Sequence, residues 1–225
     1  MSEWDDYWLK ENTFENKLYD LVAIRYRKYI IKPYLTKYLN RYFPKGSILL
    51  HAGCGGGLVE SEHINNYFTI IGMDMSQNAL ALYKANHVDY NLICADVSKT
   101  GLKNQSVNGI YSLGLIEHST KNEIHTMLLE FNRILKPDGT VILFAPPEYG
   151  STVTFFKITD YILNTLLKRN IWFQPHPKSE PEINRIQSRE WMEEIIQDTN
   201  LIIIEFNFEL KDLYTHIAIV LKKIK

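Results

Sequence analysis

The sequence has few cysteines, no long apolar run and almost no net charge. Its two cysteines, Cys54 and Cys94, are too few for a disulfide framework or a cysteine-rich metal site. We therefore expect a reducing compartment and no bound metal. No stretch approaches the ~20 consecutive apolar residues that a membrane span needs, and the acidic start lacks the pattern of a signal peptide. These absences favour a cytoplasmic protein.

The formal net charge of -1 gives no general reason to expect a DNA partner. The charges are, however, unevenly distributed along the chain. Residues 17–45 contain eight Lys and Arg and one Asp, whereas the flanking parts of the chain are acidic. This segment also carries six tyrosines. A solvated helix face explains such a pattern, and an RNA, a membrane surface or another anionic partner remains an alternative.

Hydrophobic periodicity predicts two N-terminal helices, at residues 14–31 and 34–43, separated near Pro33. In the second helix, Leu35, Leu39 and Phe43 form an apolar line at i+4 spacing, and Lys37, Arg41 and Lys45 form a basic one. We interpret residues 1–46 as a helical cap on the body of the protein.

Beyond residue 46, short apolar runs alternate with helical segments. The runs lie at residues 47–50, 68–73, 90–95, 109–113 and 140–145, and the intervening helices at 58–66, 76–86 and 121–135. Strands that are apolar without alternation are typical of a parallel sheet covered on both faces. The pattern predicts a doubly wound α/β fold with a cofactor-binding core at residues 47–147.

The C-terminal part predicts a helix at 188–198 and two strands at 201–209 and 214–222, which the short turn between them makes antiparallel. The sheet would then have seven strands, mostly parallel, with an antiparallel last strand. Residues 148–187 interrupt the alternation and are predicted to form a helical lid beside the site. We expect a single domain over residues 1–225, divided at 46, 147 and 187.

Five of the 11 glycines lie between Gly46 and Gly57, directly after the first predicted strand. Ligands bind at this end of the strands in such sheets, and glycine lets the backbone turn tightly or approach a ligand closely. The dinucleotide fingerprint needs glycines at positions 1, 3 and 6, but the sixth position from Gly53 is Leu58. The pattern present is Gly-x-Gly-x-Gly.

Five ordered motifs resemble those of the class I S-adenosylmethionine-dependent methyltransferases, nearest to the small-molecule branch of type 11. They are LHAGCGGG at 50–57, IGMDMS at 71–76, CADV at 94–97, LGLIEH at 113–118 and NRILKPDGT at 132–140. The resemblance implies a Rossmann-like fold and S-adenosylmethionine as the cofactor. It places the cofactor contacts at His51, Gly53, Cys54, Gly55, Gly57, Asp74, Met75, Asp96, Val97 and Leu113. In particular, it assigns the ribose hydroxyls to Asp74 and the adenine amino group to Asp96.

Two positions depart from the family pattern. His51 stands where the family usually has an acid, and Gly109 stands at the entry of the fourth strand where an acid is common. A histidine can still hydrogen-bond, although its charge depends on pH. These departures leave a catalytically silent cofactor-binding module as one alternative to an enzyme.

The catalytic and acceptor-binding residues are less sharply defined. His118, at the end of the fourth strand, is a candidate general base, with a packing role as the alternative. Trp4, Tyr7 and Trp8 are expected to fold over the cofactor cleft, as N-terminal segments do in similar enzymes. Phe155, Trp172 and Phe173 in the predicted lid favour an apolar or aromatic acceptor.

The resulting hypothesis is an enzyme that methylates an oxygen, nitrogen or carbon atom of a small-molecule acceptor and releases S-adenosylhomocysteine. A methyltransferase acting on RNA or another anionic acceptor through the basic N-terminal helices is the alternative. The sequence predicts no oligomeric state.

Overall fold

The computed structural model describes residues 3–8, 25–59, 62–87, 91–148, 183–208 and 215–224, and the single positions 161 and 165. Within these residues the strands form one seven-stranded sheet with the order β3-β2-β1-β4-β5-β7-β6. The strands are β1 (Ile48–Ala52), β2 (Thr69–Asp74), β3 (Asn91–Cys94), β4 (Val107–Leu113), β5 (Leu135–Ala145), β6 (Leu201–Phe208) and β7 (Ile217–Lys223). The neighbouring strands β3, β2, β1, β4 and β5 run parallel, and β7 is antiparallel to both β5 and β6. The predicted sheet is confirmed.

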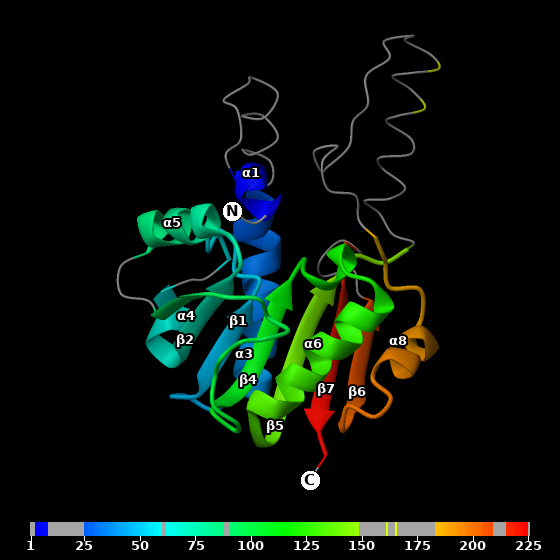
Figure 1. The fold of residues 1–225 in the computed structure, drawn as a ribbon. Coiled ribbons are helices and arrows are strands. Elements are labelled where there is room, and N and C mark those ends of the chain that lie inside the picture. The colour runs from blue at the N-terminus through cyan, green and yellow to red at the C-terminus, as the bar shows by residue number, and fades with distance from the viewer. Residues whose placement is uncertain are drawn as a thin grey trace.

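Helices cover both faces of the sheet (Figure 1). They are α1 (Glu3–Trp8), the π-helical η1 (Arg27–Ile31), α3 (Lys32–Tyr42), α4 (Glu62–Tyr67), α5 (Gln77–Asn86), the 3-10 turn η2 (Ile116–His118), α6 (Lys121–Ile134) and α8 (Arg189–Ile195). One core cluster joins α6 and α8 to the sheet, and a second joins α3 and α4 to the opposite face. No helix in the described part of the chain has the length and apolar character of a membrane span.

The α3 helix follows the predicted pattern closely. Pro33 lies in its first turn, where a missing backbone N–H is tolerated, and η1 leads directly into it. Leu35 and Leu39 are fully buried, whereas Lys37 and Arg41 are exposed. The buried face of the helix therefore packs on the sheet, and the basic line faces solvent.

Several element boundaries differ from the prediction. Leu58 and Val59 precede α4 without being helical, because the turn of the glycine loop continues through Gly57, whose N–H donates to the carbonyl of Cys54. The α8 helix ends at Ile195 rather than near residue 198, and residues 196–200 form turns in which Asp198 and Asn200 adopt left-handed φ of 60° and 57°. The described part does not include residues 9–24, 149–160, 166–182 and 209–214. It therefore does not test the predictions for most of the first helix and most of the lid.

A polar cluster around Glu205 joins α3 to the edge strand β6. Arg41 Nη1 donates to Glu205 Oε1 at 2.7 Å, the hydroxyl of Tyr42 donates to Oε2, and Asn207 Nδ2 donates to Oε1 at 2.8 Å. Burial raises the pKa of Glu205, but the hydrogen bonds from Tyr42 and Asn207 and the charge of Arg41 outweigh it, so the pKa lies below its ordinary value. Burial and the bond to Glu205 raise the pKa of Tyr42 to about 12.

We expect Glu205→Gln to destabilise the protein at neutral pH but much less in acid. Because the folded state lowers the pKa of Glu205, its stabilising contribution is full above the unfolded-state pKa of about 4.3 and is lost as the pH falls through the folded-state value. Urea unfolding should show a difference of about 1 kcal/mol at neutral pH. Glu194→Gln, which removes an exposed ion pair with Lys121, is the control and should change little. A Glu205→Gln effect that is equal at both pH values would contradict the assignment.

Candidate functional site

The loop after β1 has a backbone that favours glycine. Gly53, Gly55 and Gly57 have φ of 66°, 52° and 69°, a region that other residues rarely adopt. Side chains would also collide with their surroundings: a Cβ on Gly53 would lie 2.9 Å from Leu115 Cδ1, and one on Gly57 would lie 2.6 Å from the ring of Tyr83. The Gly-x-Gly-x-Gly spacing is therefore required by the shape of the loop at the carboxyl edge of the sheet.

The carboxylate of Asp74, at the end of β2, holds this loop. The N–H of Gly55 donates to Asp74 Oδ2 at 2.9 Å, and the N–H of Ser76 donates to Oδ1 at 2.9 Å. Ser76 in turn caps α5, since its Oγ accepts from the N–H of Ala79. Each carboxylate oxygen can accept more than one hydrogen bond, so Asp74 retains acceptor capacity for a ligand hydroxyl. The glycine backbone of the loop and the carboxylate beside it fit a cofactor that carries a nucleoside.

The N-terminal helix α1 docks on this loop. Asp5 is 4% exposed and accepts hydrogen bonds from Ser76 Oγ at 2.8 Å and from the N–H of Asn78 at 3.4 Å. Trp8 lies against the glycines, with its ring atoms 2.9 Å from where a Cβ on Gly55 would stand. A six-residue helix is not stable by itself, so these contacts hold α1 in place. The sequence analysis had singled out Trp8 but not Asp5, because nothing in an acidic start distinguishes the one acid that becomes buried.

The other end of α1 reaches the end of β4. The ring of Trp4 meets that of His118 edge-on, with 5.0 Å between the ring centroids. His118 ends the turn η2 and is half-buried. The side chain of Tyr7 lies outside the described part of the structure, as do Phe155, Trp172 and Phe173. Trp4 and Trp8 thus bring α1 into contact with both the glycine loop and the candidate base.

The remaining predicted contacts are divided between the edge of the sheet and its interior. Met75 is 41% exposed, next to Asp74, and Asp96 is exposed after β3, where its Oδ1 accepts from the N–H of Ser98 at 2.8 Å. Cys54 is buried within the loop, and its N–H donates to the carbonyl of Met73. Val97 packs into the core on the α6 face, and Leu113 packs at the edge of the core on the α3 face.

His51, at the end of β1, is buried. It is 2% exposed, and its ring stacks on Tyr111 with 4.4 Å between the centroids. Tyr111 belongs to the core on the α3 face of the sheet. The histidine that replaces the usual acid therefore takes part in core packing in this structure.

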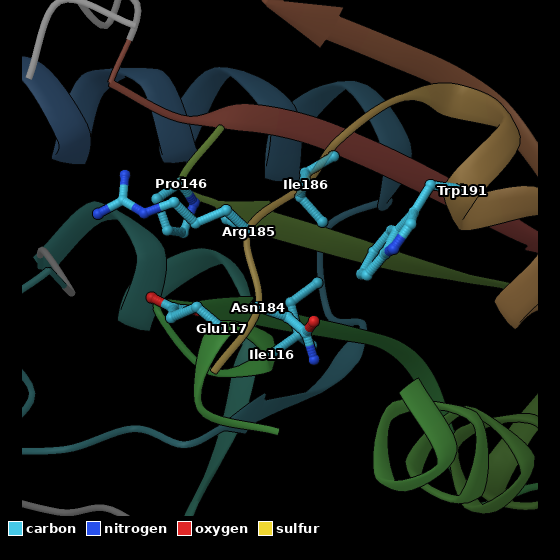
Figure 2. Close-up of a pocket in the computed structure, with 8 residues that line it drawn as sticks. Ile116, Glu117, Pro146, Asn184, Arg185, Ile186 and Trp191 are labelled. Atoms are coloured by element: carbon cyan, nitrogen blue, oxygen red, sulfur yellow. The ribbon is translucent and has the colours of Figure 1, made fainter. Parts of the chain in front are cut away.

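The carboxyl ends of β4 and β5 border a narrow pocket, too tight to admit a water molecule. Its lining comprises Ile116, Glu117, Ala145, Pro146, Asn184, Arg185, Ile186 and Trp191. Figure 2 shows the side chains of Glu117 and Arg185 on the side of the pocket away from Trp191. Residues 183–186 close the pocket: the N–H groups of Ile183 and Asn184 donate to the carbonyl of Glu117, and that of Ile186 donates to the carbonyl of Pro146.

The sequence analysis did not single out the polar residues of this pocket. Glu117 is 5% exposed and belongs to the 113–118 motif, which marks the place without distinguishing the residue. Asn184 and Arg185 follow a long segment without a recognised motif, so no pattern assigns them to a site. Among the described residues, no three His, Cys, Asp or Glu side chains gather in a way that could hold a metal ion.

Comparison with known proteins finds similarity to methyltransferases. A family model described as a methyltransferase domain matches residues 50–143. The chain is 28% identical over 147 residues to the tRNA (carboxymethyluridine(34)-5-O)-methyltransferase of Saccharomyces cerevisiae, covering 64% of this chain and 52% of that protein. It is 26% identical over 148 residues to the ubiquinone biosynthesis O-methyltransferase of Coxiella burnetii, covering 62% of each. The chain thus matches about half to two thirds of these relatives' length.

Solved structures share the fold. The magnesium protoporphyrin IX methyltransferase of Synechocystis, solved with bound SAH, superposes with a TM-score of 0.62 at 13% identity. The superposition covers 96% of this chain and 90% of that one. At this level of identity the likeness concerns the fold, including the end of the sheet where the glycine loop lies.

Proposed function

We propose that this chain is a class I S-adenosylmethionine-dependent methyltransferase that transfers a methyl group to an oxygen, nitrogen or carbon nucleophile and releases S-adenosylhomocysteine. The observation that carries the proposal is the hydrogen bond from the N–H of Gly55 to Asp74, which joins the glycine loop to the acid of the second strand. That pairing gives a surface without side chains next to a hydroxyl-binding carboxylate.

Residues of the loop and of the two neighbouring strand ends would hold the cofactor. Asp74 would accept hydrogen bonds from the ribose hydroxyls, and Asp96 would accept one from the adenine amino group. When bound, the cofactor supplies an electrophilic methyl group on a positively charged sulfur. Trp8, over Gly55, would shield this part of the site from water. These roles follow the resemblance of the motifs and the placement of the side chains at one edge of the sheet.

The acceptor would be held at the ends of β4 and β5. Methyl transfer depends mainly on aligning the nucleophile with the methyl group, because the leaving group is already activated. His118 would accept the proton of a hydroxyl or amine nucleophile, with Trp4 fixing the orientation of its ring. The reacting end of the acceptor would lie at the ends of these strands, beside His118 and Glu117.

Two acceptor classes have support. A small-molecule acceptor is supported by similarity to a ubiquinone biosynthesis O-methyltransferase. An RNA acceptor is supported by similarity to a tRNA methyltransferase and by the basic character of residues 17–45. In both classes the atom that accepts the methyl group would be held at the ends of β4 and β5.

Calorimetry with S-adenosylmethionine and S-adenosylhomocysteine tests the proposal. We expect both to bind with one site per chain, and we expect turnover of labelled cofactor when a cell extract supplies the acceptor. Absence of binding by either compound would refute the assignment. Binding without turnover in any extract fraction would instead favour a silent cofactor-binding module.

A further inference from the structure

Residues 25–45, which we call the basic segment, carry an unusual concentration of positive charge. They include seven Lys and Arg and no Asp or Glu: Arg25, Arg27, Lys28, Lys32, Lys37, Arg41 and Lys45. The segment comprises η1, α3 and the turn that follows. From Arg25 to Arg41, at 1.5 Å per residue, it extends roughly 24 Å along the α3 face of the sheet. Arg41 is already paired with Glu205, and the six other cations still exceed what one small anionic ligand could neutralise.

The N-terminal end of the basic segment lies at the edge of the sheet where the parallel strands β4 and β5 end. The hydroxyl of Tyr26 is hydrogen-bonded to Thr215 Oγ1. Thr215 comes two residues before β7, whose Ile217 pairs with Ala145 at the end of β5. Ala145 also lines the narrow pocket. Arg25, next to Tyr26, is therefore placed on the same edge of the sheet as the narrow pocket.

Arg185 adds a further cation to this edge. It lines the pocket, and its Nη1 donates to the carbonyl of Pro147 at 3.3 Å. Arg25 and Lys28 are exposed on η1 and the helical residues before it. The edge of the sheet thus carries positive charge from two distant parts of the chain, on either side of the end of β5.

Tyr29 gives the basic segment an exposed aromatic surface. It is 65% exposed, and the Nζ of Lys28 lies 5.5 Å from the centroid of its ring. At the other end of the segment, Lys45 Nζ lies 5.2 Å from the ring centroid of Tyr67, which is 39% exposed. Exposed aromatic rings beside cations are the combination on which single-stranded nucleic acids stack and pair their phosphates.

A membrane surface is a poorer fit to the same segment. A helix that lies on a bilayer inserts its apolar face between the lipids. In α3 that face is already used, because Tyr34, Leu35, Tyr38 and Leu39 are between 0% and 4% exposed and pack against the sheet. α3 therefore presents no apolar face that could insert into lipid. Binding of a nucleic acid does not require such a face.

We propose that the basic segment is a docking surface for single-stranded RNA, with the RNA backbone along α3 and its acceptor nucleotide at the carboxyl ends of β4 and β5. Tyr29 stacks on a base near the catalytic edge, and Arg25 and Lys28 contact the adjacent phosphates. The assignment of an RNA acceptor rests on the proposed methyltransferase function, whereas the docking itself is measurable without methyl transfer.

Fluorescence anisotropy with a labelled oligouridylate tests the docking. We expect binding by the full chain that weakens with salt, and a shallower salt dependence for the double variant Arg25→Gln with Lys28→Gln. The loss of two phosphate contacts should lower the slope of log K against log salt by about 1.4. Lys84→Gln with Lys103→Gln, exposed cations on α5 and before β4, is the matched control and should leave the slope unchanged.

The role of the ring is tested separately. Tyr29→Ala should weaken oligouridylate binding about tenfold, and Tyr29→Phe should restore it, because stacking needs the ring and not the hydroxyl. Equal losses in the control pair and the Arg25/Lys28 pair would overturn the proposal. So would salt-independent binding, or binding of the full chain to phosphatidylserine vesicles and not to oligouridylate.

Calorimetry with S-adenosylhomocysteine on the same variants separates the two hypotheses. Unchanged cofactor affinity with no RNA binding overturns the docking surface and leaves the methyltransferase proposal in place. If the natural chain does not bind S-adenosylhomocysteine, the methyltransferase proposal is refuted. The RNA would then not be a methyl acceptor, even if anisotropy shows that it binds.

Discussion

Replacing Gly109 with aspartate should severely destabilise the folded protein. A Cβ at this position in β4 would lie 2.1 Å from Cε1 of Phe43, closer than atoms of the folded protein can approach. Phe43 is 6% exposed at the end of α3 and belongs to the core on that face. An aspartate adds a buried charge to the collision, so we expect a loss of more than about 4 kcal/mol. Circular dichroism and urea unfolding of the variant measure the loss.

A double-mutant cycle isolates the contact. Gly109→Ala should destabilise the protein by about 1–3 kcal/mol in the natural background. In a Phe43→Leu background, where the ring is absent, the same change should be less unfavourable. Additive effects in the two backgrounds would show that Phe43 is not the obstacle.

Asp74→Ala should weaken binding of S-adenosylhomocysteine about 100-fold. The change removes the carboxylate that accepts from the N–H groups of Gly55 and Ser76, and so it releases the glycine loop as well as the proposed ribose contact. Hydrogen bonds to charged groups contribute about 1.5–3 kcal/mol each, and a 100-fold loss corresponds to about 2.7 kcal/mol. Calorimetry measures the change in affinity.

Two further variants sharpen this result. Asp74→Asn keeps one acceptor oxygen and should give an intermediate affinity. Glu193→Ala, an exposed acid on α8, should bind as the natural chain does. A folded Asp74→Ala protein with unchanged affinity would refute the placement of the ribose.

The sequence predicted the elements better than the contacts between them. Apolar runs without alternation are a local property, so the strands and the loop carrying Gly53 could be placed from the pattern alone. The pairing of Gly109 with Phe43 could not, because it joins residues 66 positions apart and each looks ordinary in its own segment. Asp5 was missed for the same reason: its burial depends on the start of α5, which is distant in sequence.

The ends of elements were the weakest predictions. Helix α8 stops at Ile195, and the turns after it contain Asp198 and Asn200 in left-handed conformation, where no glycine marks the end of the helix. The polar lining of the pocket was also missed, because Asn184 and Arg185 are brought to Glu117 by backbone hydrogen bonds that no side-chain pattern encodes. Sequence patterns therefore indicated the glycine loop and Asp74, whereas the structure was needed to bring Asn184 and Arg185 to Glu117.

The position of β7 constrains the order in which the protein assembles during synthesis. This strand lies between β5 and β6 yet follows both along the chain. On the ribosome, β5 and β6 emerge with unpaired edges, and Thr140–Ala145 has no partner on that side until 217–222 is made. The half-built sheet is open to pairing with other nascent chains during that interval. The yield of native protein should therefore depend on chaperones that shield these edges until β7 inserts.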